Sequence, residues 1–327
     1  MNRAMALRIA FFVPLLAMLA WHYTHNPNDY SFLQELQGKY LAPLVLLSIG
    51  QLLLEALRFS FTANTVWGRL TVSQAFAFLV FSRLLNRIVP QSGLLYKVRM
   101  LQKQQDSSFG RVVLIFGSMA WMQLCFTLLI AIALLLGREP ALEVAGVSVL
   151  FILITVQLLL IGGTILAGIV PIKRFAEIER LNRRLRRVLK AVSNAVEGLT
   201  QLISAPRLLV LSALAIASSI LLGVTRLVLC FMMLGYSLDF DEGAVFIAIN
   251  RLLNVTTLTP GNVGITELAY GGLAHGVGFG VAAGVTAALL IRILSFLTLS
   301  LCGGTIALLR PELATEISAD EELAAPD

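Results

Sequence analysis

The stretch from Arg251 to Glu267, RLLNVTTLTPGNVGITE, places charged, amide, Pro and Gly residues in the middle of an otherwise apolar C-terminal third. A segment that only crossed a bilayer would not need them, because interrupted backbone in hydrocarbon must be satisfied by protein or water. Pro260, Gly261 and Gly264 predict a hairpin tip, since Pro fixes one torsion and Gly permits left-handed backbone and close approach. We interpret the stretch as a binding site.

A helix that returns from this tip would have chemical consequences. If Ile265 or Thr266 opens a half-helix, its free N–H groups face an anion at the tip. Glu267 then lies in the first turn, where it favours the helix dipole and can pair with Arg251 or Arg292, or titrate as a proton-coupling group. A helix cap is the plainer role for Glu267.

A partial repeat of this stretch lies 168 residues upstream. There Arg83-Leu84-Leu85-Asn86 repeats Arg251-Leu252-Leu253-Asn254. Each copy is followed by a Pro and then a Gly, at Pro90 with Gly93 and at Pro260 with Gly264. Two interrupted apolar segments at corresponding places in two halves indicate the binding site of a transporter-like fold.

Several charged residues fall inside apolar segments, where charges are costly and usually face a cavity or a partner. They are Glu55, Arg58, Arg83, Arg87, Arg226, Arg251, Glu267 and Arg292. Two carboxylates neutralise only two arginines, so the others need an anionic partner such as a lipid phosphate, which Arg binds bidentately. The alternative is that an Arg binds carbonyls at a helix end or reaches the interface. We favour that alternative for Arg58 and Arg226, and ligand binding for Arg251 and Arg292.

The composition indicates a membrane protein. Of 327 residues 57% are hydrophobic and 13% are charged, and several apolar runs exceed the length that spans a bilayer. The net charge of +6 fits cytoplasmic loops and anionic headgroups rather than nucleic acid. The three Cys and three His make no metal or catalytic pattern, so we expect no metal, cofactor or catalytic residue.

Charge counting predicts an all-α polytopic integral membrane protein of about six transmembrane helices and two re-entrant hairpins, or six to ten crossings if the hairpins span. The expected spans are Ile9–Trp21, Tyr40–Phe61, Arg111–Leu136, Leu142–Val170, Leu208–Leu234 and Val281–Leu309, with hairpins beginning at Ser73 and Ala244. Each half then crosses an odd number of times, which predicts an inverted repeat.

The predicted organisation is one transmembrane domain over residues 1–310, with half one at about 1–137 and half two at about 138–310. A basic segment, residues 172–190, is expected in the cytoplasm, where its apolar stripe lies on anionic lipid or packs on the bundle. Arg3 and Arg8 favour an uncleaved anchor, so both termini are expected in the cytoplasm. A polar tail follows at 311–327.

The chain resembles the membrane region of lysylphosphatidylglycerol synthase, a flippase-like family. The resemblance rests on Pro90-Gln91-Ser92-Gly93 with Lys97 and Arg99, and on Thr259-Pro260-Gly261 through Gly264 and Glu267 with Arg292, and it covers roughly residues 5–310. Members often carry an acidic residue after the first-motif Gly, where this chain has Leu94. The resemblance implies a multi-pass protein of the cell inner membrane that binds or translocates a charged lipid. We do not expect synthase activity, because no aminoacyl-transferase domain follows the last span.

Three functions follow from these residues. The first is a flippase-like transporter for an anionic or amino-acylated phospholipid or a polyprenyl-phosphate-linked lipid. In it, inner-side and outer-side residues guide the headgroup: Arg83, Asn86, Arg87, Lys97 and Arg99, then Arg251, Asn254, Glu267 and Arg292, with Glu55 as a further ion-pair or proton-coupling candidate. The alternative is a membrane glycosyltransferase or accessory subunit in cell-envelope glycolipid synthesis. The third is a scaffold for envelope-synthesis enzymes.

Overall fold

The computed structural model describes residues 37–66, 70–88, 92–105, 109–137, 143–144, 146–169, 206–256 and 262–309. The expected first span at 9–21, the basic segment at 172–190 and the tail at 311–327 lie outside these residues.

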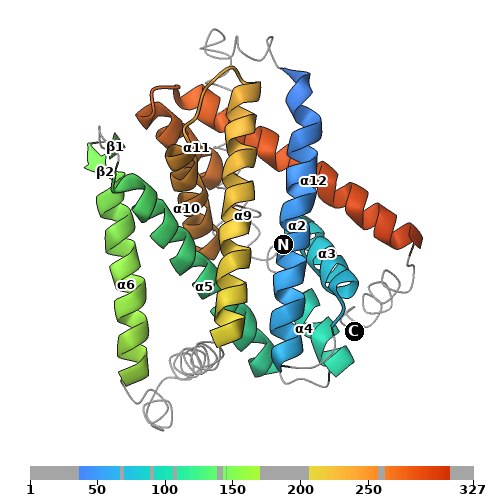
Figure 1. Ribbon diagram of the computed structural model, residues 1–327. Helices are drawn as coiled ribbons and strands as arrows, with labels where there is room; N and C mark the ends of the chain where they lie inside the picture. The colour runs from blue at the N-terminus through green and yellow to red at the C-terminus, as the bar shows by residue number, and fades with distance from the viewer. Residues whose placement is uncertain are drawn as a thin grey trace, which may run out of the picture.

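The described residues are almost entirely helical (Figure 1). The helices are α2 (Leu41–Val66), α3 (Val72–Ile88), α4 (Ser92–Gln105), α5 (Phe109–Leu135), α6 (Val149–Ile169), α9 (Pro206–Met233), α10 (Phe240–Thr256), α11 (Ile265–Gly276) and α12 (Val281–Leu309), with a 3₁₀ turn at Gly38–Tyr40 before α2. The predicted all-α polytopic fold is confirmed.

Among the described residues, four helical stretches are long and apolar enough to cross a membrane. They are Gly38–Asn64, Phe116–Leu135, Leu209–Met233 and Val281–Leu309, and shorter apolar helices lie at Val72–Asn86 and Val149–Ile165. Large apolar side chains point outward from these helices, as Phe151, Leu159 and Leu308 do. Such a surface suits hydrocarbon rather than water.

Several hydroxyl side chains within the apolar helices are satisfied locally. Thr155, Thr164 and Thr298 each donate their hydroxyl to the carbonyl four residues earlier. In hydrocarbon a hydroxyl has no water partner, so this back-bonding allows a Ser or Thr to remain in a spanning helix.

The predicted start of the fourth crossing was wrong. The crossing predicted from Leu142 begins instead at Val149, because Glu143–Val144 (β1) and Val147–Ser148 (β2) pair as a short antiparallel ladder. The β-branched valines favour the extended form, and the ladder packs beside α11 at one end of the molecule (Figure 1).

Each predicted hairpin is a pair of short helices. The first comprises α3 and α4, with 17 and 14 residues. The second comprises α10 and α11, with 17 and 12 residues. These helices are shorter than the roughly 20 residues that span a bilayer, so the structure has helix pairs where the sequence placed its two interrupted segments.

The two halves repeat the same order of elements. The order α2, α3, α4, α5 is followed by α9, α10, α11, α12. Helices α3 and α10 have the same length, and both of their ends are 168 positions apart. The sequence similarity around Arg83 and Arg251 is therefore part of a structural repeat rather than a chance match of four residues.

Helices α2 and α9 pack antiparallel at the centre of the repeat (Figure 1). The amide N–H of Gln37, before α2, donates to the carbonyl of Met233 at the end of α9, at 3.3 Å. Midway along, the Gln51 side chain donates to the Ser219 carbonyl at 3.4 Å, and these residues are themselves 168 positions apart. Equivalent residues that meet on antiparallel helices define a two-fold axis across the helices, as an inverted repeat requires.

The first helix of each hairpin also packs on a helix of the other half. Helix α3 packs on α12, and α10 packs on α5. At one of these contacts Gly303 of α12 faces Leu84 and Val80 of α3, and an added Cβ would lie 2.9 Å from the Leu84 side chain. These contacts bring the charged ends of both hairpins toward the middle of the bundle.

Candidate functional site

One face of α2 carries a polar stripe through an apolar helix. Ser48, Gln51, Glu55, Arg58 and Thr62 follow one another at alternating spacings of three and four residues, which aligns them along a single helix face. Glu55 lies 14 residues after the first residue of α2 and 11 before the last, near the middle of the span. The stripe faces α9 and the hairpins rather than lipid.

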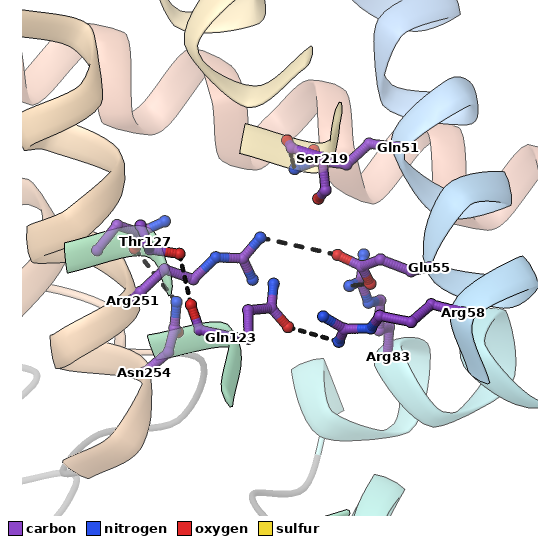
Figure 2. Close-up of polar contacts among 10 residues, drawn as sticks. Gln51, Glu55, Arg58, Arg83, Gln123, Thr127, Ser219, Arg251 and Asn254 are labelled. Carbon is purple, nitrogen blue, oxygen red and sulfur yellow. Dashed lines mark hydrogen bonds and ion pairs between the residues drawn. The ribbon is translucent and has the colours of Figure 1, made fainter. Parts of the chain in front are cut away.

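The carboxylate of Glu55 is shared by the two halves of the molecule. Arg83 of α3 pairs with one oxygen, and the Nη2 atom of Arg251 in α10 lies 3.8 Å from the other. Figure 2 shows Arg251 reaching from α10 toward Glu55 while Arg83 approaches it from α3. The repeat-related arginines thus converge on one acid.

More cations surround this carboxylate than it can neutralise. Arg58 donates to the Gln123 side chain of α5 at 2.7 Å, as Figure 2 shows. Lys97 of α4 and Arg226 of α9 lie close enough to interact electrostatically with members of the group. We call Glu55, Arg58, Arg83, Lys97, Arg226 and Arg251 the central cluster. Its net charge is +4 when each side chain is ionised, an arrangement that attracts an anion.

The first hairpin is closed by hydrogen bonds around Gly93. The Asn86 side chain accepts from the Gly93 N–H at 2.8 Å, and Ser82 donates its hydroxyl to the Gly93 carbonyl at 2.9 Å. A Cβ at Gly93 would lie 2.0 Å from the Ser82 carbonyl oxygen. Asn86 and Gly93 therefore hold α3 against α4.

The second hairpin closes in a related way. The Asn262 side chain donates to the Leu253 carbonyl at 2.9 Å and to the Asn254 side chain at 3.0 Å. Asn254 is 168 positions after Asn86, and both use a side-chain oxygen to hold their turn. Asn86 and Asn254 therefore have structural contacts within their hairpins. Their predicted role in ligand binding stays a prediction.

Glu267 combines a cap with an ion pair. Helix α11 begins at Ile265, one of the two predicted starts, and Glu267 lies in its first turn. The carboxylate accepts from the Gly264 N–H, and its other oxygen lies 2.8 Å from Nη2 of Arg292. Gly264 has a φ of 90°, a backbone conformation that residues with a side chain rarely adopt. The anion at the N-terminus of α11 is therefore the carboxylate of Glu267 itself. Glu267 pairs with Arg292 rather than with Arg251.

The remaining predicted residues are placed as follows. Arg99 is exposed on α4, and Lys97 is partly covered, with its ammonium 5.2 Å from the ring centre of Phe116. Arg87 lies in the last turn of α3, where the structure does not describe its side chain. Pro90, Pro260 and Gly261 lie outside the described residues.

The sequence reasoning missed several polar residues of the site. Gln51, Gln123 and Ser219 were not considered, although Gln123 binds Arg58 and Gln51 joins the two halves. Arg226, expected to have a local role, donates to Ser48 of α2 at 3.3 Å. The signals were present: Gln51 with Ser219 and Arg58 with Arg226 share the 168-residue spacing of Arg83 with Arg251, and the α2 stripe has helical spacing.

Comparison with known proteins supports the family resemblance of the chain. The family described as lysylphosphatidylglycerol synthase TM region matches residues 5–303, which include both hairpins and the whole central cluster. The searches of curated proteins and of solved structures each found no match. The family match covers most of the 327 residues, and the resemblance expected from the hairpin motifs is confirmed. This multi-pass membrane protein belongs to the family of the lysylphosphatidylglycerol synthase TM region.

Proposed function

We propose that the protein is a flippase-like transporter that binds the anionic headgroup of a lipid at the central cluster and passes it between the two hairpins. The observation that carries this proposal is the sharing of Glu55 between Arg83 and Arg251, which belong to opposite halves. Substrate sites in inverted-repeat transporters lie at the repeat interface near the bilayer midplane.

The charge balance supports an anionic ligand. Arginines in the middle of a bilayer need a partner, and in the described part of the chain Glu55 is the one carboxylate of the central cluster. The Gln51–Ser219 contact lies one helical turn along α2 from Glu55. The cluster is therefore beside the axis that relates the halves, where a headgroup can be passed from one to the other.

We further propose that the protein lies in the cell inner membrane with both termini in the cytoplasm. The start of α2 and the end of α9 lie at one end of the bundle (Figure 1). That end carries Asp239, Asp241 and Glu242, as an external face can under the positive-inside rule. Reporter fusions after residue 239 and at the C-terminus should give external and cytoplasmic signals respectively, and the opposite pair would reverse the topology.

The first test is lipid movement in proteoliposomes that contain labelled anionic phospholipids. The wild type should move a labelled lipid between leaflets, and Arg251→Ala should slow it by about 10- to 100-fold, the effect of removing one charge-assisted contact. Arg207→Ala is the matched control, because Arg207 is exposed in the first turn of α9. A folded wild type that moved no lipid would refute transport. An Arg251→Ala variant as fast as the control would refute binding at the central cluster.

A further inference from the structure

The cations of the central cluster that Glu55 does not contact have neutral partners. Arg58 donates to the Gln123 amide and Arg226 to the Ser48 hydroxyl. The Lys97 ammonium lies over the ring of Phe116. Within the described residues these three side chains therefore keep a full unit of positive charge each, in a region where uncompensated charge is costly.

The one carboxylate of the cluster breaks the internal repeat. Arg83 and Arg251 are equivalent by position, and so are Arg58 and Arg226, but the position 168 residues after Glu55 is Gly223. An acid at both positions would have given each half its own counter-anion. Instead a single oxyanion lies between two equivalent guanidinium groups (Figure 2).

Planar guanidinium groups bind carboxylate and phosphate oxygens in the same way. The carboxylate of Glu55 therefore occupies a place that a phosphate can take, and it holds Arg83 and Arg251 together when no lipid is bound. With Glu55 still ionised, the cluster keeps four charges to be met by the ligand. A phosphodiester brings one negative charge, whereas a terminal phosphate brings about two.

We propose that the preferred ligand is a lipid that ends in a phosphomonoester or a diphosphate, and that Glu55 is a built-in counter-anion for the arginines that bind it. This inference rests on the proposed function and deepens it by naming the headgroup class. The three terminal oxygens of a monoester can accept hydrogen bonds from Arg83, Arg251 and Arg58 together, whereas a phosphodiester offers two.

The test compares two lipids with the same acyl chains, a phosphomonoester and a phosphodiester whose second ester is to glycerol. Dioctanoyl phosphatidic acid carries a phosphomonoester, and dioctanoyl phosphatidylglycerol carries a phosphodiester on the same chains. Binding of each to the full-length protein in nanodiscs is measured by calorimetry at constant ionic strength, at pH 5 and at pH 7.5. At pH 7.5 the monoester should bind at least about tenfold more tightly, as expected for one additional charge-assisted contact.

The pH dependence separates charge from shape. The second ionisation of a phosphomonoester has a pKa of about 6, so the monoester gains its second charge as the pH rises. Its advantage should shrink toward parity at pH 5. The diester keeps one negative charge at both pH values, and the arginines stay protonated. A change in its affinity between pH 5 and pH 7.5 would therefore be due to Glu55 or Lys97.

A second variant tests the counter-anion. Glu55→Gln removes the competing oxyanion and should tighten binding of the monoester by several-fold, whereas Arg207→Ala should leave it unchanged. If the diester binds as tightly as the monoester at pH 7.5, the headgroup class is wrong although lipid binding stands. If neither lipid binds, the proposed function falls with it. Weaker monoester binding by Glu55→Gln would contradict the counter-anion.

Discussion

At the scale of single residues, two of the buried acids, Glu55 and Glu267, have different roles. Glu55 lies among several cations on a polar stripe, whereas Glu267 is 1% exposed, caps α11 and pairs with one cation, Arg292. The first arrangement leaves positive charge over for a ligand, and the second is neutral. We therefore assign ligand binding to the central cluster and hairpin stability to the Glu267 pair.

Glu267→Gln should lower stability, because it removes the carboxylate that pairs with the Arg292 guanidinium. Breaking a buried ion pair costs about 3–5 kcal/mol. The measurement is the apparent melting temperature of purified protein in detergent. The double variant Glu267→Gln with Arg292→Met removes both charges and should recover part of the loss. A single variant as stable as the wild type would show that the pair has no structural role.

At the scale of elements, each hairpin is closed by the side-chain amide of an Asn in the last turn of its first helix. Asn86 holds Gly93, and Asn254 holds Asn262. The helices are short, so their mutual position depends on these contacts as much as on apolar packing. The arginines of α3 and α10 lie one turn before the clamping Asn, which means that each clamp also positions an arginine of the central cluster.

Gly93→Ala should destabilise the first hairpin, because the new Cβ would lie 2.0 Å from the Ser82 carbonyl oxygen. Overpacking of this kind costs up to about 3 kcal/mol. Gly163→Ala in α6 is the matched control, since nothing lies within 4 Å of its added Cβ. That change should be neutral or stabilise by up to about 1 kcal/mol. Equal melting temperatures for the two variants would contradict the close approach.

At the scale of the whole molecule, the antiparallel pair α2 and α9 relates the halves. A contact on the two-fold axis, such as Gln51 with Ser219, is its own equivalent. A contact away from the axis, such as Gln37 with Met233, lies at one end of the pair. If the halves exchange accessibility, the axial contact persists while the end contacts alternate.

Cross-linking should distinguish these contacts. In a variant lacking the three native Cys, a thiol cross-link between Gln37→Cys and Met233→Cys should hold one end closed and stop lipid movement. A cross-link between Gln51→Cys and Ser219→Cys should leave most of the movement intact. The measurement is the proteoliposome assay before and after reduction. A block by the axial cross-link alone would contradict an exchange about this axis.

The sequence by itself determined the class of fold and the places where it is interrupted. Apolar length and the distribution of basic residues do not depend on tertiary contacts. Helix α3 therefore begins within one residue of its predicted start, and α12 has its predicted bounds. The arginines and Glu267 were recognisable because charges are rare in apolar segments. The ladder at Glu143–Ser148 was missed because two-residue strands are specified by pairing rather than by periodicity.

Only the tertiary structure decided which charges meet. The sequence left open whether Glu267 pairs with Arg251 or Arg292, and it assigned Arg83 and Arg251 to opposite sides of the membrane. The structure places both arginines on Glu55 and gives Arg292 to Glu267. The physical reason is that ion pairing depends on distances of a few ångströms between helices far apart in the chain. Those distances were set by the antiparallel packing of α2 on α9 and by the contacts of α3 with α12 and of α10 with α5.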